Sequence, residues 1–135
     1  LTQLALARFL AAGEYQGHIE RARAFYLERR DALLEASTKH LGGLATIEEP
    51  AGGGHLWLTL SVTVDEGELM TEAVRNGVTF VPGGAMIPEP AAGTHMRLSY
   101  GFLDPDQLAE GVRRLARAIH SMEKQPRVSE ALPIT

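Results

Sequence analysis

Apolar and polar positions recur with two different periods along this chain, and the periods divide it into helices and strands. Apolar residues three and four apart predict a short helix over Leu1 to Ala12, which stops near Gly13, and a long helix from His18 to about Leu41 with a charged outer face. The same spacing predicts a short helix after the capping residue Asp65 and a final helix from Pro105 to Met122. The chain is therefore rich in amphipathic helices.

Between these helices the pattern changes to period two, which is typical of half-buried strands. Residues Leu44 to Glu49 and His55 to Leu60 are expected to pair as a hairpin across a glycine-containing connection. Val78 to Val81 predicts a brief buried strand, and Met96 to Gly101 predicts another. The order of elements predicts an α+β fold, a small and mainly antiparallel sheet covered by helices and preceded by a long helix.

Arg97 is the most informative charged residue because it lies inside a predicted strand. Leu98 and Tyr100 alternate with Arg97 and Ser99, so Arg97 is expected on the face opposite the apolar side chains. An arginine held on a strand presents a planar fork that matches a carboxylate, and each charge-assisted hydrogen bond contributes about 1.5–3 kcal/mol. The alternative from the residues alone is an edge-strand arginine paired with a nearby acid.

Three blocks give the sequence a family resemblance: EEPAGGGHLWLTL from Glu48, NGVTFVPGGAM from Asn76 and THMRLSYGFLDPDQLAEGVRRLARAI from Thr94. In this order and spacing they resemble the C-terminal part of class I/II, fold-type-I aminotransferases, which depend on pyridoxal phosphate. The nearest branch contains 2-aminoadipate and broad-specificity aminotransferases and the aminotransferase-like domains of GntR-type regulators. The resemblance extends over nearly all of Leu1 to Met122.

The resemblance implies a function and a division of the chain. Arg97 would bind the substrate α-carboxylate, and the substrates would be amino acids and 2-oxo acids. Residues 1–17 would be a helical segment from the large-domain side, residues 18–122 the small C-terminal domain, and residues 123–135 a loose tail. The long helix would link the two domains, and the complete protein would be a homodimer.

The family's cofactor-binding lysine motif is absent from this sequence, whose only lysines are Lys39 and Lys124. Both are expected to be surface residues, because neither lies in the desolvated setting that makes a lysine amine nucleophilic. Pyridoxal phosphate would therefore be bound mainly by a large domain outside this chain, and no catalytic or cofactor-binding residue is assigned here. The start at Leu1, without a methionine, suits a piece of a longer protein that is inactive alone.

The composition of the chain excludes several classes of protein function. A chain of 135 residues, 44% hydrophobic, is expected to form one domain, and its net charge of −4 argues against direct nucleic-acid binding. No apolar run approaches the ~20 residues of a membrane span, and the absence of cysteine fits a reducing cytoplasm. The histidines show no metal-ligand spacing, so no metal site is expected. His55 and His95 could each line a pocket, but a position at a solvent edge is the favoured interpretation for both.

Two alternatives to the enzyme stay open at this stage. The parent protein is either an aminotransferase or a transcriptional regulator that uses the same domain to sense an effector. A self-standing interaction domain is the third reading, and the apolar helix Leu1 to Ala12 argues against it because that helix needs a surface to cover.

Overall fold

The computed structural model describes residues 1–87 and 93–124. Its helices are α1 (Thr2–Ala11), α2 (Tyr15–Leu41), α3 (Glu66–Arg75) and α4 (Pro105–Lys124), with a short 3-10 turn, η1 (Gly83–Ala85). Its strands are β1 (Ala45–Glu48), β2 (His55–Leu60), β3 (Val81–Pro82) and β4 (His95–Ser99). The fold class is α+β, as predicted.

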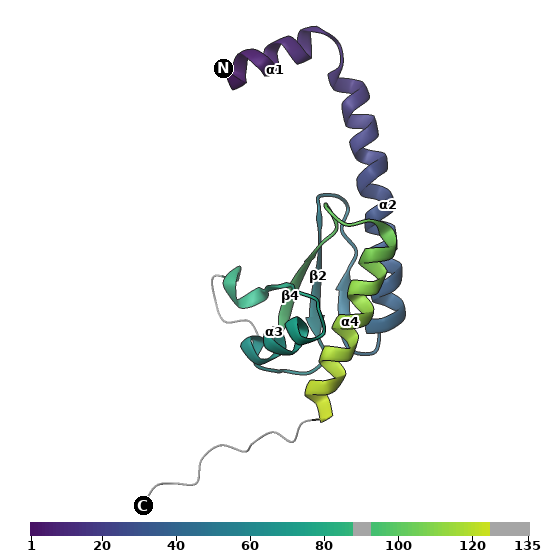
Figure 1. The fold of residues 1–135 in the computed structure, drawn as a ribbon, viewed down its shortest axis with the longest axis vertical. Coiled ribbons are helices and arrows are strands. Elements are labelled where there is room, and N and C mark those ends of the chain that lie inside the picture. Colours follow the sequence, from purple (N-terminus) through teal and green to yellow (C-terminus); the bar gives the residue numbers. More distant parts are fainter. Residues whose placement is uncertain (88–92, 125–135) are drawn as a thin grey trace, which may run out of the picture.

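The strands form one antiparallel four-stranded sheet in the order β1-β2-β4-β3. In the register of β2 with β4, Leu58 lies opposite Met96 and Trp57 lies opposite Arg97. Because side chains alternate between faces, the first pair points to one side of the sheet and the second pair to the other. Helices α2 and α4 pack against each other, and α3 packs on α4 (Figure 1).

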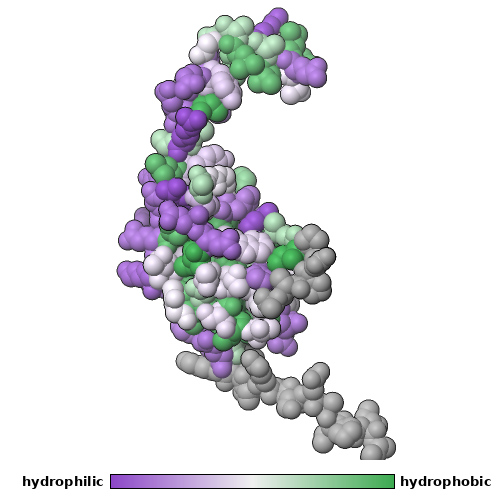
Figure 2. All heavy atoms as spheres, turned by 180° about the vertical axis from the view of Figure 1, so that it is seen from behind, coloured by the Kyte–Doolittle hydropathy of each residue, from purple (hydrophilic) through white to green (hydrophobic). Residues whose placement is uncertain are grey.

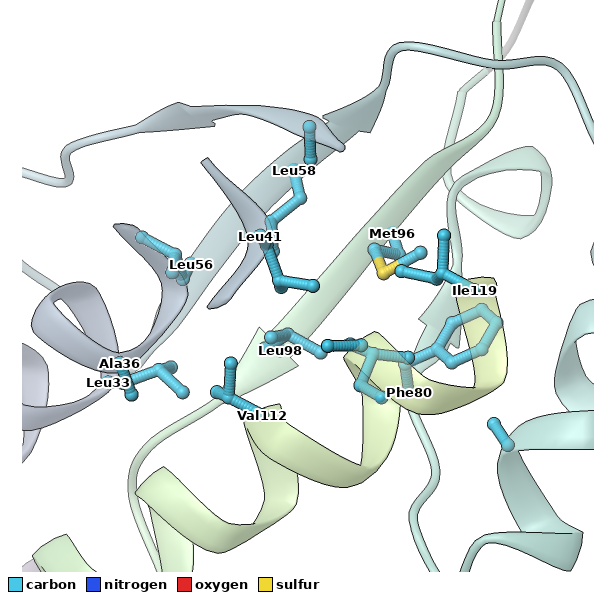
Figure 3. Close-up of a cluster of buried hydrophobic side chains, with 14 of the residues drawn as sticks. Leu33, Ala36, Leu41, Leu56, Leu58, Phe80, Met96, Leu98, Val112 and Ile119 are labelled. Atoms are coloured by element: carbon cyan, nitrogen blue, oxygen red, sulfur yellow. The ribbon is translucent and has the colours of Figure 1, made fainter. Parts of the chain in front are cut away.

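The core lies between these helices and the apolar face of the sheet. Figure 3 shows Leu58 and Met96 of the sheet close to Ile119 of α4 and Leu41 of α2. All four side chains are fully buried, with exposures of 0%. Burial of apolar surface on this one face is the main favourable term that holds helices and sheet together.

Two predicted helix starts are confirmed by their capping contacts. An Oδ1 of Asp65 accepts a hydrogen bond from the Glu68 backbone N–H at 2.8 Å. At the start of α4, Asp104 Oδ1 accepts from the Gln107 N–H at 2.9 Å, and Gln107 Oε1 accepts from the Asp104 N–H at 3.2 Å. Both caps satisfy backbone donors that a helix N-terminus leaves unpaired.

Several element boundaries differ from the predictions, and three of these differences bear on the fold. The long helix begins at Tyr15 and not at His18. The strand predicted over Val78 to Val81 is only Val81–Pro82, because the Val78 N–H bonds the Ala73 carbonyl at 3.0 Å and so completes the end of α3. Helix α4 continues past Met122 to Lys124, so the start of the predicted tail is helical, and residues 125–135 of that tail lie outside the described residues.

Helix α1 and the first half of α2 extend away from the sheet (Figure 1). No residue of α1 is buried, and hydrophobic side chains are visible over this segment in Figure 2. The exposed large apolar residues of this segment are Leu1, Leu4, Leu6, Leu10, Tyr15, Phe25, Tyr26 and Leu27. An uncovered apolar surface of this kind marks a contact with other protein surface.

The buried face gives a stability prediction. Leu58→Ala removes a fully buried side chain from a central strand, so we expect the free energy of unfolding to fall by about 2–5 kcal/mol. Urea denaturation followed by circular dichroism measures the change. Val74→Ala, at a residue that is 56% exposed on α3, is the matched control and should change stability by about 0.5 kcal/mol or less. Equal losses in the two variants would contradict the assignment of the core.

The exposed segment gives a second prediction. The 135-residue chain should self-associate through α1, because its apolar residues have no covering surface in the described structure. Leu6→Glu and Leu10→Glu, one helical turn apart, should shift sedimentation toward the monomer, whereas Gln3→Glu adds the same charge without removing an apolar side chain. A wild-type chain that sediments as a concentration-independent monomer would count against this expectation.

Candidate functional site

The face of the sheet opposite the helices carries the chemistry of this chain. It is formed by the alternate residues of the two central strands, which are His55, Trp57 and Thr59 of β2 and His95, Arg97 and Ser99 of β4. Their neighbours Leu56, Leu58, Met96 and Leu98 are buried on the other side. The prediction that Arg97 lies opposite the apolar side chains is therefore confirmed.

Arg97 lies in the middle of this open face. Its strand, β4, pairs with both β2 and β3, so Arg97 has Trp57 opposite it on one side and Val81 on the other. The reading of an edge-strand arginine is wrong, because β4 is an interior strand. Within residues 1–87 and 93–124 the ion pairs are made by other cations.

The Nε atom of Arg97 is buried and has no hydrogen-bond partner among the described residues. A buried donor without an acceptor costs about 1–3 kcal/mol, and such groups are rare in folded proteins. The Nε–H and one Nη–H of a guanidinium together match the two oxygens of a carboxylate. The arrangement is chemically suited to accept a carboxylate from outside the described residues.

His95 shares the face of Arg97, as its position two residues earlier predicts, and it is half-buried. Its ring stacks on Trp57, with centroids 5.8 Å apart and planes at 23°. Its Nδ1 lies 3.0 Å from Thr59 Oγ1, at hydrogen-bond distance. The sequence pattern did not identify Trp57 and Thr59 as neighbours of the site, because their approach depends on the pairing of β2 with β4.

His55 lines a different hollow. A cavity of about 840 Å³ lies between α2 and the Ala51–Gly54 connection, and its wall includes His55, Tyr26, Arg30 and Tyr100. Arg30 donates hydrogen bonds to Asp31 Oδ1 from Nη2 at 2.7 Å and from Nε at 2.9 Å. These bonds raise the pKa of Arg30 above its usual value. Burial raises the pKa of the Tyr100 hydroxyl above its usual value. Near neutral pH, Arg30 is therefore charged and Tyr100 is a neutral phenol.

Other site chemistries receive no support in the described part of the chain. Lys39 is exposed on α2, away from the open face of the sheet. No group of three or more metal-ligating side chains occurs among the residues that the structure describes. No helix within the described ranges is long and apolar enough to cross a membrane.

Comparison with curated proteins finds relatives of two kinds. Aromatic-amino-acid aminotransferase 1 of Thermococcus litoralis is 30% identical over 124 residues, which are 92% of this chain and 30% of that protein. The 2-aminoadipate transaminase of Thermus thermophilus is 33% identical over 90% of this chain and 30% of its own length. An uncharacterized HTH-type transcriptional regulator of Bacillus subtilis, YhdI, is 34% identical over 87% of this chain and 25% of its length.

Solved structures of aminotransferases also match this chain. The kynurenine aminotransferase of Pyrococcus horikoshii, in complex with PMP, matches with a TM-score of 0.80 and 34% identity, covering 88% of this chain and 29% of that chain. The α-aminoadipate aminotransferase of Thermus thermophilus, complexed with N-(5'-phosphopyridoxyl)-L-leucine, matches with a TM-score of 0.79 and 32% identity, covering 87% of this chain and 30% of that chain. No family model matches the chain. The chain spans about 30% of the length of the aminotransferases it matches.

Proposed function

We propose that this chain, a homologue of the fold-type-I aminotransferases, is the small C-terminal domain of an enzyme that moves an amino group between an amino acid and a 2-oxo acid. The observation that carries the proposal is the buried Nε of Arg97 on the open face of the sheet, which has no hydrogen-bond partner among residues 1–87 and 93–124. In this proposal residues 1–17 lie on the large-domain side, residues 18–122 form the small domain, and residues 123–135 are the C-terminal tail.

Arg97 is the proposed ligand of the substrate α-carboxylate. Two parallel hydrogen bonds from its guanidinium fix the position of the carboxylate and, through it, the orientation of the bonds at Cα. Closing this face over the substrate excludes water and strengthens the ion pair. Pyridoxal phosphate, when bound, supplies the electron sink for the chemistry at Cα.

The cofactor itself is proposed to be held by residues outside this chain. The open face of the sheet carries Arg97 and two histidines but no lysine, and Lys39 projects from the exposed side of α2. A lysine that forms a covalent bond with pyridoxal phosphate must be neutral, which requires a desolvated or cationic setting. The chain therefore contributes a substrate ligand and no catalytic residue.

The rest of the proposal concerns the assembly and location of the complete protein and the substrate it accepts. The exposed apolar surface of α1 supports contact with the large domain or a partner subunit. We propose that the complete protein is a homodimer in the cytoplasm. The relatives carry names that refer to aromatic amino acids, 2-aminoadipate and kynurenine. We extend to this protein only what those substrates share, an α-amino and an α-carboxylate group.

A second candidate function is supported by YhdI and YdfD, two HTH-type regulators of Bacillus subtilis that match this chain at 34% and 30% identity. In that case the domain binds an amino-acid effector with the same Arg97 contact and does not turn it over. Incubating the complete protein with the twenty standard amino acids, L-2-aminoadipate and L-kynurenine, plus 2-oxoglutarate, distinguishes the two functions. Turnover supports the enzyme, and binding without turnover supports the sensor.

The role of Arg97 gives the central prediction. In the complete protein, Arg97→Ala should lower kcat/KM for every accepted amino acid by an amount equivalent to about 2–5 kcal/mol, because the substrate carboxylate loses its partner in a partly desolvated site. Arg97→Lys should restore only part of the loss, since a point charge does not reproduce the planar fork. Steady-state kinetics measures both variants.

Cofactor absorbance and melting temperature are the controls for this experiment. Both should stay close to wild type in Arg97→Ala, because the buried Nε of Arg97 has no hydrogen-bond partner within the described structure. Near-normal kcat/KM, or a loss explained entirely by unfolding, would mean that Arg97 is not the carboxylate ligand.

The absence of a lysine motif gives a prediction for the chain alone. The 135-residue polypeptide should retain no stoichiometric covalent pyridoxal phosphate and should have no transaminase activity. The test is to add cofactor, treat the mixture with borohydride, remove the excess and locate any label by peptide mass spectrometry. One equivalent trapped at Lys39 or Lys124 would overturn the assignment of the cofactor lysine to another part of the protein.

A further inference from the structure

A stacked pair of rings lies beside Arg97 on the open face of the sheet. Trp57 and His95 are both half-buried there, with ring centroids 5.8 Å apart and planes at 23°. They are not part of the hydrophobic core, which occupies the opposite face of the same strands. Apolar packing in the core therefore does not account for this pair.

The strand register explains how the rings meet. Trp57 lies directly opposite Arg97, and Thr59 lies directly opposite His95. The stack of Trp57 on His95 is thus a diagonal contact, within reach of large aromatic side chains on paired strands. It brings the indole of Trp57, whose backbone lies directly opposite Arg97, against the ring of His95.

His95 is held on more than one side. Its Nδ1 lies 3.0 Å from Thr59 Oγ1. At the turn after β3, a Cβ added to Gly83 would come within 2.3 Å of the His95 Cβ and 2.9 Å of its carbonyl oxygen, so the backbone there packs directly against His95. These contacts restrain the imidazole, and through the stack they restrain Trp57.

The geometry points to Trp57, His95 and Thr59 as a positioning cluster for Arg97. An arginine on an uncovered sheet face is normally solvated and samples many rotamers. Arg97 instead has a buried Nε, with Trp57 beside it on β2 and Val81 beside it on β3. In this inference the cluster restricts the rotamers of Arg97, so the guanidinium is already oriented when a carboxylate arrives. This inference rests on the proposed function of Arg97.

The test uses the complete protein with pyridoxal phosphate and the amino acid that reacts fastest in the panel above. Thr59→Val removes the hydroxyl that contacts His95 and keeps the shape of the side chain, and Trp57→Ala removes the stack. Each should lower kcat/KM by about 10- to 100-fold, the size expected from misplacing a binding group by about 1 Å. Thr59→Ser and Trp57→Phe should recover much of the activity.

Thr46→Val is the matched control. Thr46 lies opposite Thr59 on β1, on the same face of the sheet, and is exposed. The same substitution there should leave kcat/KM unchanged. Melting temperatures of all variants show whether any loss reflects unfolding.

Two further measurements show whether the cluster acts through Arg97. The decarboxylated amine of the same substrate lacks the carboxylate, so its slow reaction should be nearly insensitive to Thr59→Val. In an Arg97→Ala background, Trp57→Ala should cause little additional loss, because residues that act through one group are not additive.

The outcomes separate this inference from the proposed function. If Arg97→Ala is impaired while Thr59→Val and Trp57→Ala both match wild type, the positioning role is overturned and the carboxylate assignment stands. Equal losses for the amino acid and the amine, or full additivity with Arg97→Ala, also overturn it. If Arg97→Ala itself matches wild type, or if no amino acid in the panel reacts, the proposed function fails and this inference fails with it.

Discussion

The pairing of β2 with β4 is the constraint on which the rest of the structure depends. These strands are the two central members of the sheet, and each carries one edge strand on its outer side. Their register places Leu58 opposite Met96 on the core face and Trp57 opposite Arg97 on the open face. A slip of one residue would exchange the faces and bury an unpaired arginine against the helices, at high cost. The hydrogen bonds that align the core therefore also assemble the candidate site.

The local sequence pattern is sufficient to predict most helices and strands, because the signals for each element lie within a few neighbouring residues. The alternation of apolar and polar residues around Arg97 predicts that its side chain lies on the face opposite the core. The capping residues Asp65 and Asp104 predict the starts of α3 and α4. The strand expected from Val78 fails for a reason that hydrophobicity does not show. The Val78 N–H is used by the end of α3, and pairing with β4 begins at Val81.

The neighbours of Arg97 could not be predicted in the same way. Trp57 and Arg97 are separated in sequence by α3 and β3, and no local period fixes which residue of β2 faces which residue of β4. The contact of Thr59 with His95 and the approach of Gly83 to His95 depend on the same long-range register. Family resemblance indicated Arg97 as a site residue, but only the paired strands show what surrounds it.

Arg97 differs from the other buried polar groups of the described residues in a way that supports the proposed ligand contact. Thr94 is buried on the same chain segment, yet its Oγ1 accepts from the Val64 N–H at 2.9 Å and donates to the Val64 carbonyl at 2.8 Å. Within the described ranges, two buried side-chain atoms lack partners, Ser37 Oγ and Arg97 Nε. Ser37 is 0% exposed within the helical layer, out of reach of any ligand. Arg97 lies on the open face of the sheet. Its unsatisfied donor therefore supports the proposed carboxylate site.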